Sequence, residues 1–253
     1  MAADSDSRWE VQFPDPETAR PNGLLAYGGD LSPSTLLSAY AQGIFPWYSE
    51  AEPILWWAPN PRCILMPQDF AISKRSLRKI RNSGFAYSFD RNFVAVMRGC
   101  AMPRKGDPET WLIPEMQSAY QSLFDLGYAH SVEIWQQGNL VGGVYGVYIG
   151  RAFFGESMFR LAPEASRAAL VCLIALLREL NALFLDCQLP TAHMLAMGAF
   201  NIPRKLFTSL LAKNALPRQN EASRASFRDY EKRLGSIEGI PAAKRSERPP
   251  SLR

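Results

Sequence analysis

Two short stretches, AFFGESMF at residues 152–159 and LFLDCQ at residues 183–188, decide the fold that we expect. Each begins with an apolar run that predicts a buried strand. Each run then stops at an acidic residue, Glu156 in the first stretch and Asp186 in the second. Because ligands of open α/β sheets gather where strands end, we expect both carboxylates at one cleft. Residue type alone favours a turn residue and a helix cap, since most carboxylates are solvated.

The segments around these stretches follow the order hairpin, strand, long helix, strand. We predict a β-hairpin from residues 131–135 and 140–149, which flank a QQGN turn. A third strand at 152–155, a helix at 164–180 and a return strand at 183–186 complete the order. Further helices are expected at residues 32–43, 73–82, 93–102, 114–127, 191–198 and 203–212. Together these elements predict an α+β sheet domain.

The chain has 253 residues, enough for one large domain or for one domain with a small partner domain. We predict a small N-terminal domain at residues 1–62, a larger domain at 63–215 and a basic, partly disordered C-terminal extension at 216–253. Residues 1–203 hold 16 Lys and Arg against 19 Asp and Glu, whereas residues 204–253 hold 12 against 5. A basic tail can attract polyanions. A solubilising extension is the simpler role, because the end of the chain has few apolar residues.

The four cysteines, Cys63, Cys100, Cys172 and Cys187, form no Cys-x-x-Cys pair. This spacing argues against a zinc site and against a disulfide framework. We therefore expect no metal and a reducing, cytoplasmic environment. The polar N-terminus has no apolar signal core, and no stretch approaches the roughly 20 continuous apolar residues of a membrane span. No membrane partner is expected.

Two other segments could bind a flat or an anionic ligand. Trp47, Trp56 and Trp57 lie within eleven residues, among prolines. They form either a packing seam, which is the simpler role, or a stacking surface. A short predicted helix carries cations that make either a solvated face or a phosphate-contacting patch, and the segment alone favours neither. These cations are Lys74, Arg75, Arg78, Lys79 and Arg81.

Several kinds of catalytic site find little support in the sequence. The Gly-rich segment at residues 22–31 lacks the spacing of a nucleotide P-loop or of a dinucleotide fingerprint. The GESMF segment at 155–159 resembles a Gly-x-Ser-x-Gly elbow but ends in Phe159. Since the chain has only two histidines, His130 and His193, a nucleophile triad is weakly supported. A neutral, hydrogen-bonded structural role is simpler for both histidines.

Acyl-CoA N-acyltransferases share the predicted order of hairpin, strand, helix and strand. Those enzymes cradle a pyrophosphate with a Gly-rich turn at the start of the long helix. Here the equivalent segment, residues 159–167, has no glycine and carries Pro163 and Glu164. Backbone amides cannot approach a pyrophosphate closely there. The scaffold therefore fits that superfamily, whereas CoA binding is disfavoured.

In its short sequence words, the chain resembles the bacterial leucyl/phenylalanyl-tRNA–protein transferases. The words run in the order of that family over roughly residues 13–212. They are NGLLA (22–26), GGDLSP (28–33), GIFPW (43–47), WWAPNPR (56–62), TW (110–111), AHSVE (129–133), LVGGVYG (140–146), GESMF (155–159) and DCQ (186–188). Each word is weak alone, but together they are highly specific.

This resemblance implies a small N-terminal α/β domain packed on an acyl-CoA N-acyltransferase-like (GNAT-like) mixed-sheet C-terminal domain, which is catalytic. It implies transfer of Leu or Phe from aminoacyl-tRNA to the N-terminal amine of proteins that begin with Arg or Lys, which creates an N-degron. It assigns Trp47 and Trp111 to the 3′-terminal adenosine, and Glu156, Asp186 and Gln188 to catalysis and acceptor binding. The pocket for the Leu or Phe side chain maps to Val144, Phe153, Leu170, Leu173 and Leu185.

The chemistry of an aminoacyl ester agrees with this interpretation. The ester is already activated, so the reaction needs no ATP, no cofactor and no metal. The enzyme mainly has to position an amine and an ester. Our hypothesis is that Asp186 holds Gln188 and the incoming amine, and that the Gln188 amide holds the amine or the carbonyl. Glu156 would pair with the cationic acceptor, and the five cations of the short helix would contact tRNA phosphates.

The chain departs from the family at a few positions. Many relatives have NASK where this chain has EASR at residues 164–167, and SLGA where it has AMGA at 196–199. A pocket position that is often Phe is Leu173 here. These differences leave open the relative preference for Leu, Phe and Met, which an apolar pocket separates poorly. The alternatives are a CoA-dependent N-acyltransferase and a non-catalytic tRNA-binding module, and we expect a monomer.

Overall fold

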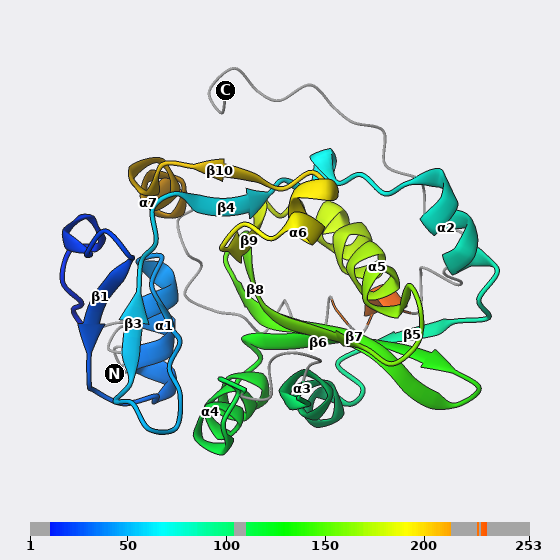
Figure 1. Cartoon of the computed structure of the whole chain (residues 1–253), viewed down its shortest axis with the longest axis horizontal. Coiled ribbons are helices and arrows are strands. Elements are labelled where there is room, and N and C mark those ends of the chain that lie inside the picture. The colour runs from blue at the N-terminus through cyan, green and yellow to red at the C-terminus, as the bar shows by residue number, and fades with distance from the viewer. Residues whose placement is uncertain (1–10, 104–109, 214–226, 228, 232–253) are drawn as a thin grey trace, which may run out of the picture.

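The computed structural model describes residues 11–103, 110–213, 227 and 229–231. A seven-stranded sheet has the order β10-β4-β9-β8-β7-β6-β5, and a three-stranded sheet has the order β1-β3-β2 (Figure 1). The strands are β1 (Leu24–Tyr27), β2 (Phe45–Pro46), β3 (Leu55–Trp57), β4 (Arg62–Leu65), β5 (Ala86–Phe89), β6 (Ala129–Gln136), β7 (Asn139–Ile149), β8 (Ala152–Arg160), β9 (Phe184–Gln188) and β10 (Phe200–Ile202). The helices are α1 (Pro33–Ala41), α2 (Lys74–Arg81), α3 (Phe93–Ala101), α4 (Pro114–Asp125), α5 (Ala165–Glu179), α6 (Ala192–Ala196) and α7 (Arg204–Lys213), with short 3-10 helices η2 (Pro16–Thr18) and η3 (Pro67–Asp69).

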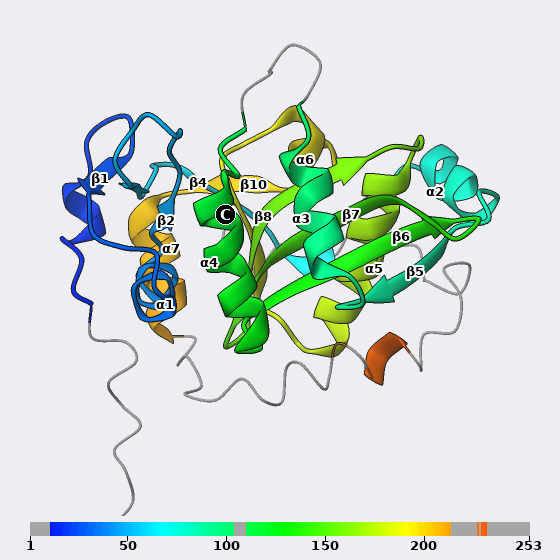
Figure 2. The same cartoon turned by 90° about the horizontal axis from the view of Figure 1, so that it is seen from below.

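The seven-stranded sheet is mixed and lies between helices. Its neighbouring strands are antiparallel except β8 and β9, which run parallel and are connected by α5. α5 covers one face, and α3 and α4 cover the other (Figures 1 and 2). α5 packs closely because its inward residues, such as Ala168, Leu173 and Leu177, are aliphatic and fully buried. The predicted α+β class and the GNAT-like order of the C-terminal domain are confirmed.

The predicted β-hairpin is confirmed, with β6 and β7 paired along their lengths. Its turn contains Gln137 and Gly138, whose φ angles are 51° and 79°. Two consecutive positive φ angles are typical of a type I′ turn, whose twist matches that of the flanking strands. The QQGN segment therefore helps to set the register of the hairpin, which lies between β8 and β5 in the large sheet.

The small domain consists of α1 and the three-stranded sheet, and its core continues into the large domain. Ser32 caps α1 by accepting a hydrogen bond from the backbone N–H of Thr35, and Pro33 begins the helix. Tyr40 of α1 packs in one hydrophobic cluster with Phe154 of β8. The sequence predicted no strands in the Gly-rich and Trp-rich segments, but β1, β2 and β3 pair there. Strands this short carry little periodic signal.

The predicted boundary between residues 62 and 63 falls inside β4, the first strand of the large sheet along the chain. The last helix, α7, lies beside the small domain (Figure 2). Gly43, just after α1, leaves room for the side chains of Phe207 and Leu211 from α7. The two domains therefore share a continuous core, and the exact division of the chain stays a prediction.

β8 and β9 extend beyond the ends that the sequence predicted. β8 pairs with β7 as far as Arg160, and β9 continues to Gln188. Pairing continues because β7 and β4 offer backbone partners beyond the point where each apolar run stops. Glu156 and Asp186 therefore lie within strands, and the prediction that they stand at strand ends is wrong.

A short helical segment of the predicted C-terminal extension packs on the large sheet. Phe227 is fully buried and stacks on His130, with ring centroids 3.9 Å apart. Tyr230 packs edge-on against Phe89. Nδ1 of His130 lies 2.7 Å from Oδ2 of Asp90, so this histidine has the structural role that we expected. Residues 216–226, 228 and 232–253 lie outside the described residues.

Among the described helices, none combines the length and the apolar character needed to cross a bilayer.

Candidate active site

A β-bulge in β8 turns Glu156 toward the small domain. Glu156 is the extra residue of the bulge, because Gly155 and Ser157 pair with adjacent residues of β7. A bulge interrupts the alternation of side chains along a strand and re-aims the bulged one. β7 has Gly146 at this point, where a Cβ atom would collide with the carbonyl oxygen of Phe154. The Gly-rich stretch of β7 thus makes room for the bulge.

A second bulge lies in β9 at Cys187. Asp186 and Gln188 pair with adjacent residues of β4, which leaves Cys187 as the extra residue. Gln188 has a φ of 59°, a left-handed conformation that non-glycine residues rarely adopt and that often marks functional sites. Its backbone N–H donates a hydrogen bond of 2.9 Å to Oδ1 of Asp186, which helps to hold this conformation.

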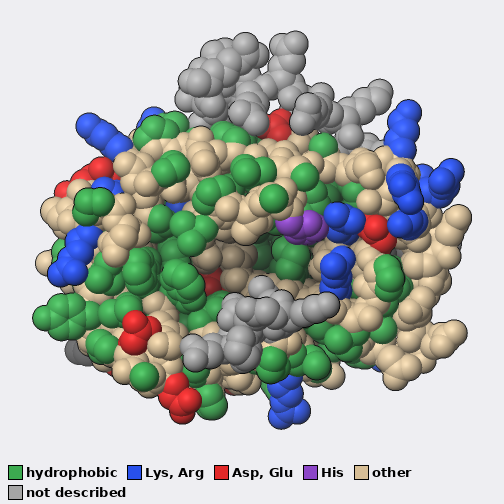
Figure 3. Space-filling model, viewed as in Figure 1, with side chains coloured by type: hydrophobic (Ala, Val, Ile, Leu, Met, Phe, Trp, Pro, Cys, Tyr) green, Lys and Arg blue, Asp and Glu red, His purple; other side chains and the backbone are tan. Residues whose placement is uncertain are grey.

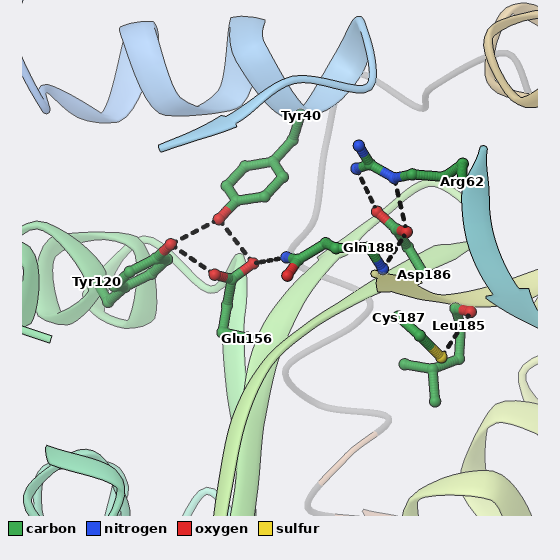
Figure 4. Close-up of polar contacts among 8 residues, drawn as sticks. All are labelled: Tyr40, Arg62, Tyr120, Glu156, Leu185, Asp186, Cys187 and Gln188. Carbon is green, nitrogen blue, oxygen red and sulfur yellow. Dashed lines mark hydrogen bonds and ion pairs between the residues drawn. The ribbon is translucent and has the colours of Figure 1, made fainter. Parts of the chain in front are cut away.

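Glu156 lies at the centre of a hydrogen-bonded group of side chains (Figure 4). Its Oε1 accepts hydrogen bonds from the Tyr40 hydroxyl at 2.8 Å and from Nε2 of Gln188 at 3.2 Å. Its Oε2 accepts a hydrogen bond from the Tyr120 hydroxyl at 2.7 Å. The two hydroxyls are themselves 2.7 Å apart. The carboxylate is thus held by residues from α1, α4 and β9.

The environment of Glu156 favours its protonated form. Burial raises the pKa of Glu156 to about 7, although the hydrogen bonds from Tyr120 and Tyr40 lower it. The number of protons available for hydrogen bonds in this group of side chains also favours the protonated form of Glu156. Burial and the Glu156 charge raise the pKa of both tyrosines well above its usual value, so both stay protonated. The two tyrosine hydroxyls and the Glu156 carboxyl group make three oxygen–oxygen contacts. Two protons are available for these contacts when Glu156 is ionised, and three are available when it is protonated. A carboxyl group whose pKa is near 7 can gain or lose its proton as substrates bind.

Asp186 is locked in place by an arginine. Nε of Arg62 donates to Oδ1 at 2.9 Å and its Nη2 donates to Oδ2 at 2.6 Å, and both side chains are almost fully buried. The guanidinium lies between the rings of Phe45 and Phe207, at 4.9 and 4.6 Å from their centroids. Bidentate pairing of this kind fixes direction as well as charge. Since Asp186 also holds the Gln188 backbone, Arg62 anchors the position of Gln188.

β8 and β9 stop pairing at Phe154 opposite Asp186, and a cavity of about 410 Å³ lies where they separate. We call it the apolar cavity, and Figure 3 shows this face hollowed near its centre, with hydrophobic side chains around the opening. Glu156 and Gln188 stand at its polar side. Its lining includes Val144, Met158, Leu170, Leu173, Leu185 and Met194, together with Ser157, Thr191 and His193.

Four of the five residues predicted for the side-chain pocket line this cavity. The fifth, Phe153, does not line it, because its ring points to Gly146 and packs in the cluster beneath. Met158 and Met194 line the cavity and were not predicted. Their flexible thioethers can adapt to apolar groups of different shape, but a single Met in a sequence gives no sign of this role.

A second hollow of about 310 Å³, the aromatic cavity, lies between the small domain and the segment before α4. Trp47 and Trp111, both predicted to bind one ring, line it together with Trp57 and Tyr48. Trp47 is 44% exposed, so one face of its ring is open to a ligand. Trp111 packs edge-on against Tyr120 with centroids 6.5 Å apart. Tyr120 also donates a hydrogen bond to Glu156, which lines the apolar cavity. Tyr120 therefore contacts one residue of each cavity.

The five predicted phosphate-binding cations all lie on α2. Ser73 caps the helix by accepting a hydrogen bond from the backbone N–H of Ser76, and Leu77 and Ile80 are buried. The five cations are exposed. α2 lies at the far edge of the large sheet from the small domain (Figure 1). Lys and Arg side chains gather there, beside the hollow (Figure 3). The structure thus keeps α2 separate from the two cavities.

Three residues of the site were not predicted as functional residues. Arg62 is the last residue of the WWAPNPR word, and Tyr40 lies in the helix predicted at residues 32–43, with no role predicted for it in the site. Tyr120 had no sequence signal, because a tyrosine on an amphipathic helix usually packs in the core. Within the described ranges, no group of three or more His, Cys, Asp or Glu side chains is arranged to hold a metal ion.

Comparisons with known proteins show which family the chain resembles. The family model for the leucyl/phenylalanyl-tRNA protein transferase matches residues 64–212, and the model for the N-terminal domain of that protein matches residues 29–60. The chain is 50% identical to the leucyl/phenylalanyl-tRNA–protein transferase of Hahella chejuensis over 201 residues, 79% of this chain and 86% of that protein. It is 52% identical to that of Desulfatibacillum aliphaticivorans over 202 residues (79% and 87%), and 48% identical to that of Stutzerimonas stutzeri over 207 residues (81% and 92%).

Proposed function

Because the chain belongs to the leucyl/phenylalanyl-tRNA–protein transferase family, we propose that it transfers Leu or Phe from aminoacyl-tRNA to the N-terminal amine of acceptor proteins. The acceptors begin with Arg or Lys, and the product is an N-degron. The observation that carries this proposal is the meeting of Glu156, Gln188 and Asp186 at one side of an apolar cavity. The protein acts as a cytoplasmic monomer.

The donor occupies the two cavities. The Leu or Phe side chain enters the apolar cavity, where Leu170, Leu173 and Leu185 offer it a buried apolar surface. The terminal adenosine stacks in the aromatic cavity against Trp47 and Trp111. An apolar pocket distinguishes one methylene by only about 1–3 kcal/mol, so Met-tRNA is a further donor.

The transfer step needs orientation more than acid or base strength. The lone pair of the acceptor amine forms a C–N bond with the ester carbonyl carbon, and the C–O bond to the ribose breaks. The ribose oxygen leaves with the electron pair of the broken C–O bond and takes up the proton that the amine loses. Gln188 holds the amine or the carbonyl through its side-chain amide, and Asp186 keeps Gln188 in place through the 2.9 Å bond to its backbone.

Acceptor choice depends on charge. When ionised, Glu156 pairs with the guanidinium or ammonium group of an N-terminal Arg or Lys. A cation at this position lowers the pKa of Glu156 from its value of about 7. Recognition of a basic residue and ionisation of the carboxyl group therefore occur together. An acceptor that begins with Ala offers no such charge and leaves the pKa of Glu156 at about 7.

The RNA is held mainly through its phosphates. The exposed cations of α2, among them Lys74, Arg78 and Arg81, favour the acceptor stem, since phosphate contacts need charge rather than base identity. Binding through them tolerates different tRNA sequences and weakens as salt rises.

A filter assay with labelled Leu-tRNA tests the proposal. Wild-type protein should label peptides that begin with Arg or Lys and leave an Ala-starting peptide unlabelled. Gln188→Ala should lose most transfer, whereas Asn201→Ala, which removes an exposed amide on β10, should keep it. Equal labelling of all three peptides would refute the acceptor assignment. Transfer of an acetyl group from acetyl-CoA in place of Leu would refute the donor assignment.

A further inference from the structure

A third cavity has no part in the proposed function. Its volume is about 700 Å³, and residues from the end of α3, the end of β8 and the start of α5 line it. It shares Met158 and His193 with the apolar cavity, so the two hollows adjoin. We call it the cationic cavity, because Arg160 and Arg167 line it. His193 also lines it, and burial together with these two arginines lowers the pKa of its imidazole. None of its lining residues in the described part of the chain is acidic.

The nitrogen atoms around the cationic cavity are available to a ligand. Arg160 is exposed, and the Arg167 side chain is 35% exposed. Arg167 uses one nitrogen to pair with Glu164 at 3.0 Å, which leaves other N–H groups of its guanidinium. Nε2 of His193 is buried and, among the residues described, has no hydrogen-bond partner. A buried polar atom without a partner indicates a missing ligand or water.

The positive charge of the cationic cavity continues onto α2. Glu164, which pairs with Arg167, also lies 4.0 Å from Nζ of Lys79 on α2. One carboxylate therefore bridges the cavity and the helix, and it partly neutralises both cations. Because Glu164 does not itself line the cavity, the cavity keeps its cationic character. A ligand with several negative charges could lie in the cavity and reach α2, whereas a single small anion would use only one part of this surface.

We propose that the cationic cavity binds phosphate groups of the single-stranded 3′ end of the donor RNA, between the aminoacyl group and the stem on α2. This inference rests on the proposed function. Guanidinium groups match phosphate geometry. Two large apolar side chains of the lining, Met102 and Leu161, are 51% and 63% exposed and offer surface to unstacked bases. The acceptor is the less suitable ligand, because Arg160 and Arg167 repel its cationic N-terminal residue.

The test compares two donors that carry the same aminoacyl ester. Phe-tRNA has all its phosphates, whereas phenylalanyl-adenosine has none. The double variant Arg160→Gln/Arg167→Gln should raise the KM for Phe-tRNA about tenfold or more near physiological salt. It should also reduce the slope of log KM against log salt by about one for each phosphate that the protein no longer neutralises. The KM for phenylalanyl-adenosine should not change, which also shows that the variant is folded.

Two controls make the result specific. Lys205→Gln removes an exposed cation from α7, far from the cationic cavity, and should leave both KM values and the salt slope as in wild type. Glu164→Gln removes the carboxylate that partly neutralises Arg167 and should lower the KM for Phe-tRNA. The double variant and Glu164→Gln should therefore change the KM for Phe-tRNA in opposite directions.

Three results would overturn the inference. The first is an unchanged KM for Phe-tRNA in the double variant. The second is an equal rise in KM for Phe-tRNA and for phenylalanyl-adenosine in the double variant. The third is a change confined to the KM of the peptide acceptor, which would assign the cavity to the acceptor chain. Failure of the proposed function itself looks different, because wild-type protein would then transfer Phe from neither donor.

Discussion

If Glu156 binds the cationic acceptor as proposed, the Tyr120 hydroxyl sets the pH at which it can do so, and Tyr120→Phe tests this directly. The hydroxyl donates a 2.7 Å hydrogen bond to Oε2 of Glu156, which favours the ionised carboxylate. The other groups around the carboxylate are Tyr40, Gln188, Asp186 and Arg62, and all of them stay in the variant. Because phenylalanine fills nearly the same space, the substitution removes the hydrogen bond to Glu156 and the contact with the Tyr40 hydroxyl, and little else.

The size of the effect follows from the strength of that hydrogen bond. A hydrogen bond to a charged group contributes about 1.5–3 kcal/mol, and part of it persists when Glu156 is protonated. A net loss of about 1.4 kcal/mol moves the titration of Glu156 upward by roughly one pH unit. With a wild-type pKa of about 7, half of Glu156 is ionised at pH 7. In the variant about a tenth is ionised, so transfer at pH 7 should fall about fivefold.

The assay is kcat/KM for an Arg-starting peptide at saturating Phe-tRNA, measured from pH 6 to pH 9. The ratio of wild type to Tyr120→Phe should be about five at pH 7 and close to one at pH 9, where both carboxyl groups are ionised. Titration of the peptide amine is common to both enzymes and cancels in the ratio. Tyr87→Phe removes a buried hydroxyl on β5 and should give a ratio near one throughout. A Tyr120→Phe ratio that stays constant with pH would refute the role of Glu156 in acceptor binding.

Three further predictions concern the rest of the site. Arg62→Ala leaves Asp186 buried and unpaired, so it should lower the free energy of unfolding by about 3–5 kcal/mol in a denaturant titration; adding Asp186→Asn should return part of that stability but no transfer activity. Leu173→Ala enlarges the apolar cavity and should shift the ratio of kcat/KM values toward Phe-tRNA over Leu-tRNA about tenfold, whereas Leu37→Ala, equally buried in α1, should leave the ratio unchanged. Burial raises the pKa of Glu156, so its contribution to the free energy of unfolding is present below about pH 4.5 and is lost as pH rises through about 7. The melting temperature of Glu156→Gln should therefore rise relative to that of wild type between pH 5 and pH 8. A difference in melting temperature that does not change with pH would contradict the raised pKa.

The sequence predicted the fold wherever a segment is long and periodic. The hairpin at β6 and β7 and the helix α5 were expected within a few residues, because apolar spacing and turn residues specify them locally. β1, β2 and β3 were missed as strands, since segments of two to four residues show no period. The ends of β8 and β9 were predicted wrongly because strand length there depends on partner strands, which are distant in sequence.

The site was predictable in part for the same reason. Glu156, Asp186 and Gln188 stand out because polar residues interrupt apolar strands, and the family words single them out. Their geometry could not be predicted, since both bulges arise from pairing with β7 and β4. Arg62 and Tyr120 act through contacts with residues 124 and 36 positions away, respectively. No local pattern marks a residue whose role depends on contacts at that separation.

The small domain contributes to the proposed acceptor site as well as to the aromatic cavity. Tyr40 reaches from α1 to Glu156, and Phe45 of β2 lies against the guanidinium that holds Asp186. Both carboxylates of the large domain therefore depend on contacts made across the boundary between the domains. If the small domain moved away, Glu156 would lose one of its two phenol donors and Arg62 one of its two aromatic neighbours. Loss of a donor raises the pKa of Glu156 further, so a separated large domain would hold a protonated carboxyl group with little affinity for a cationic acceptor. Close docking of the two domains is thus a chemical requirement of acceptor selection.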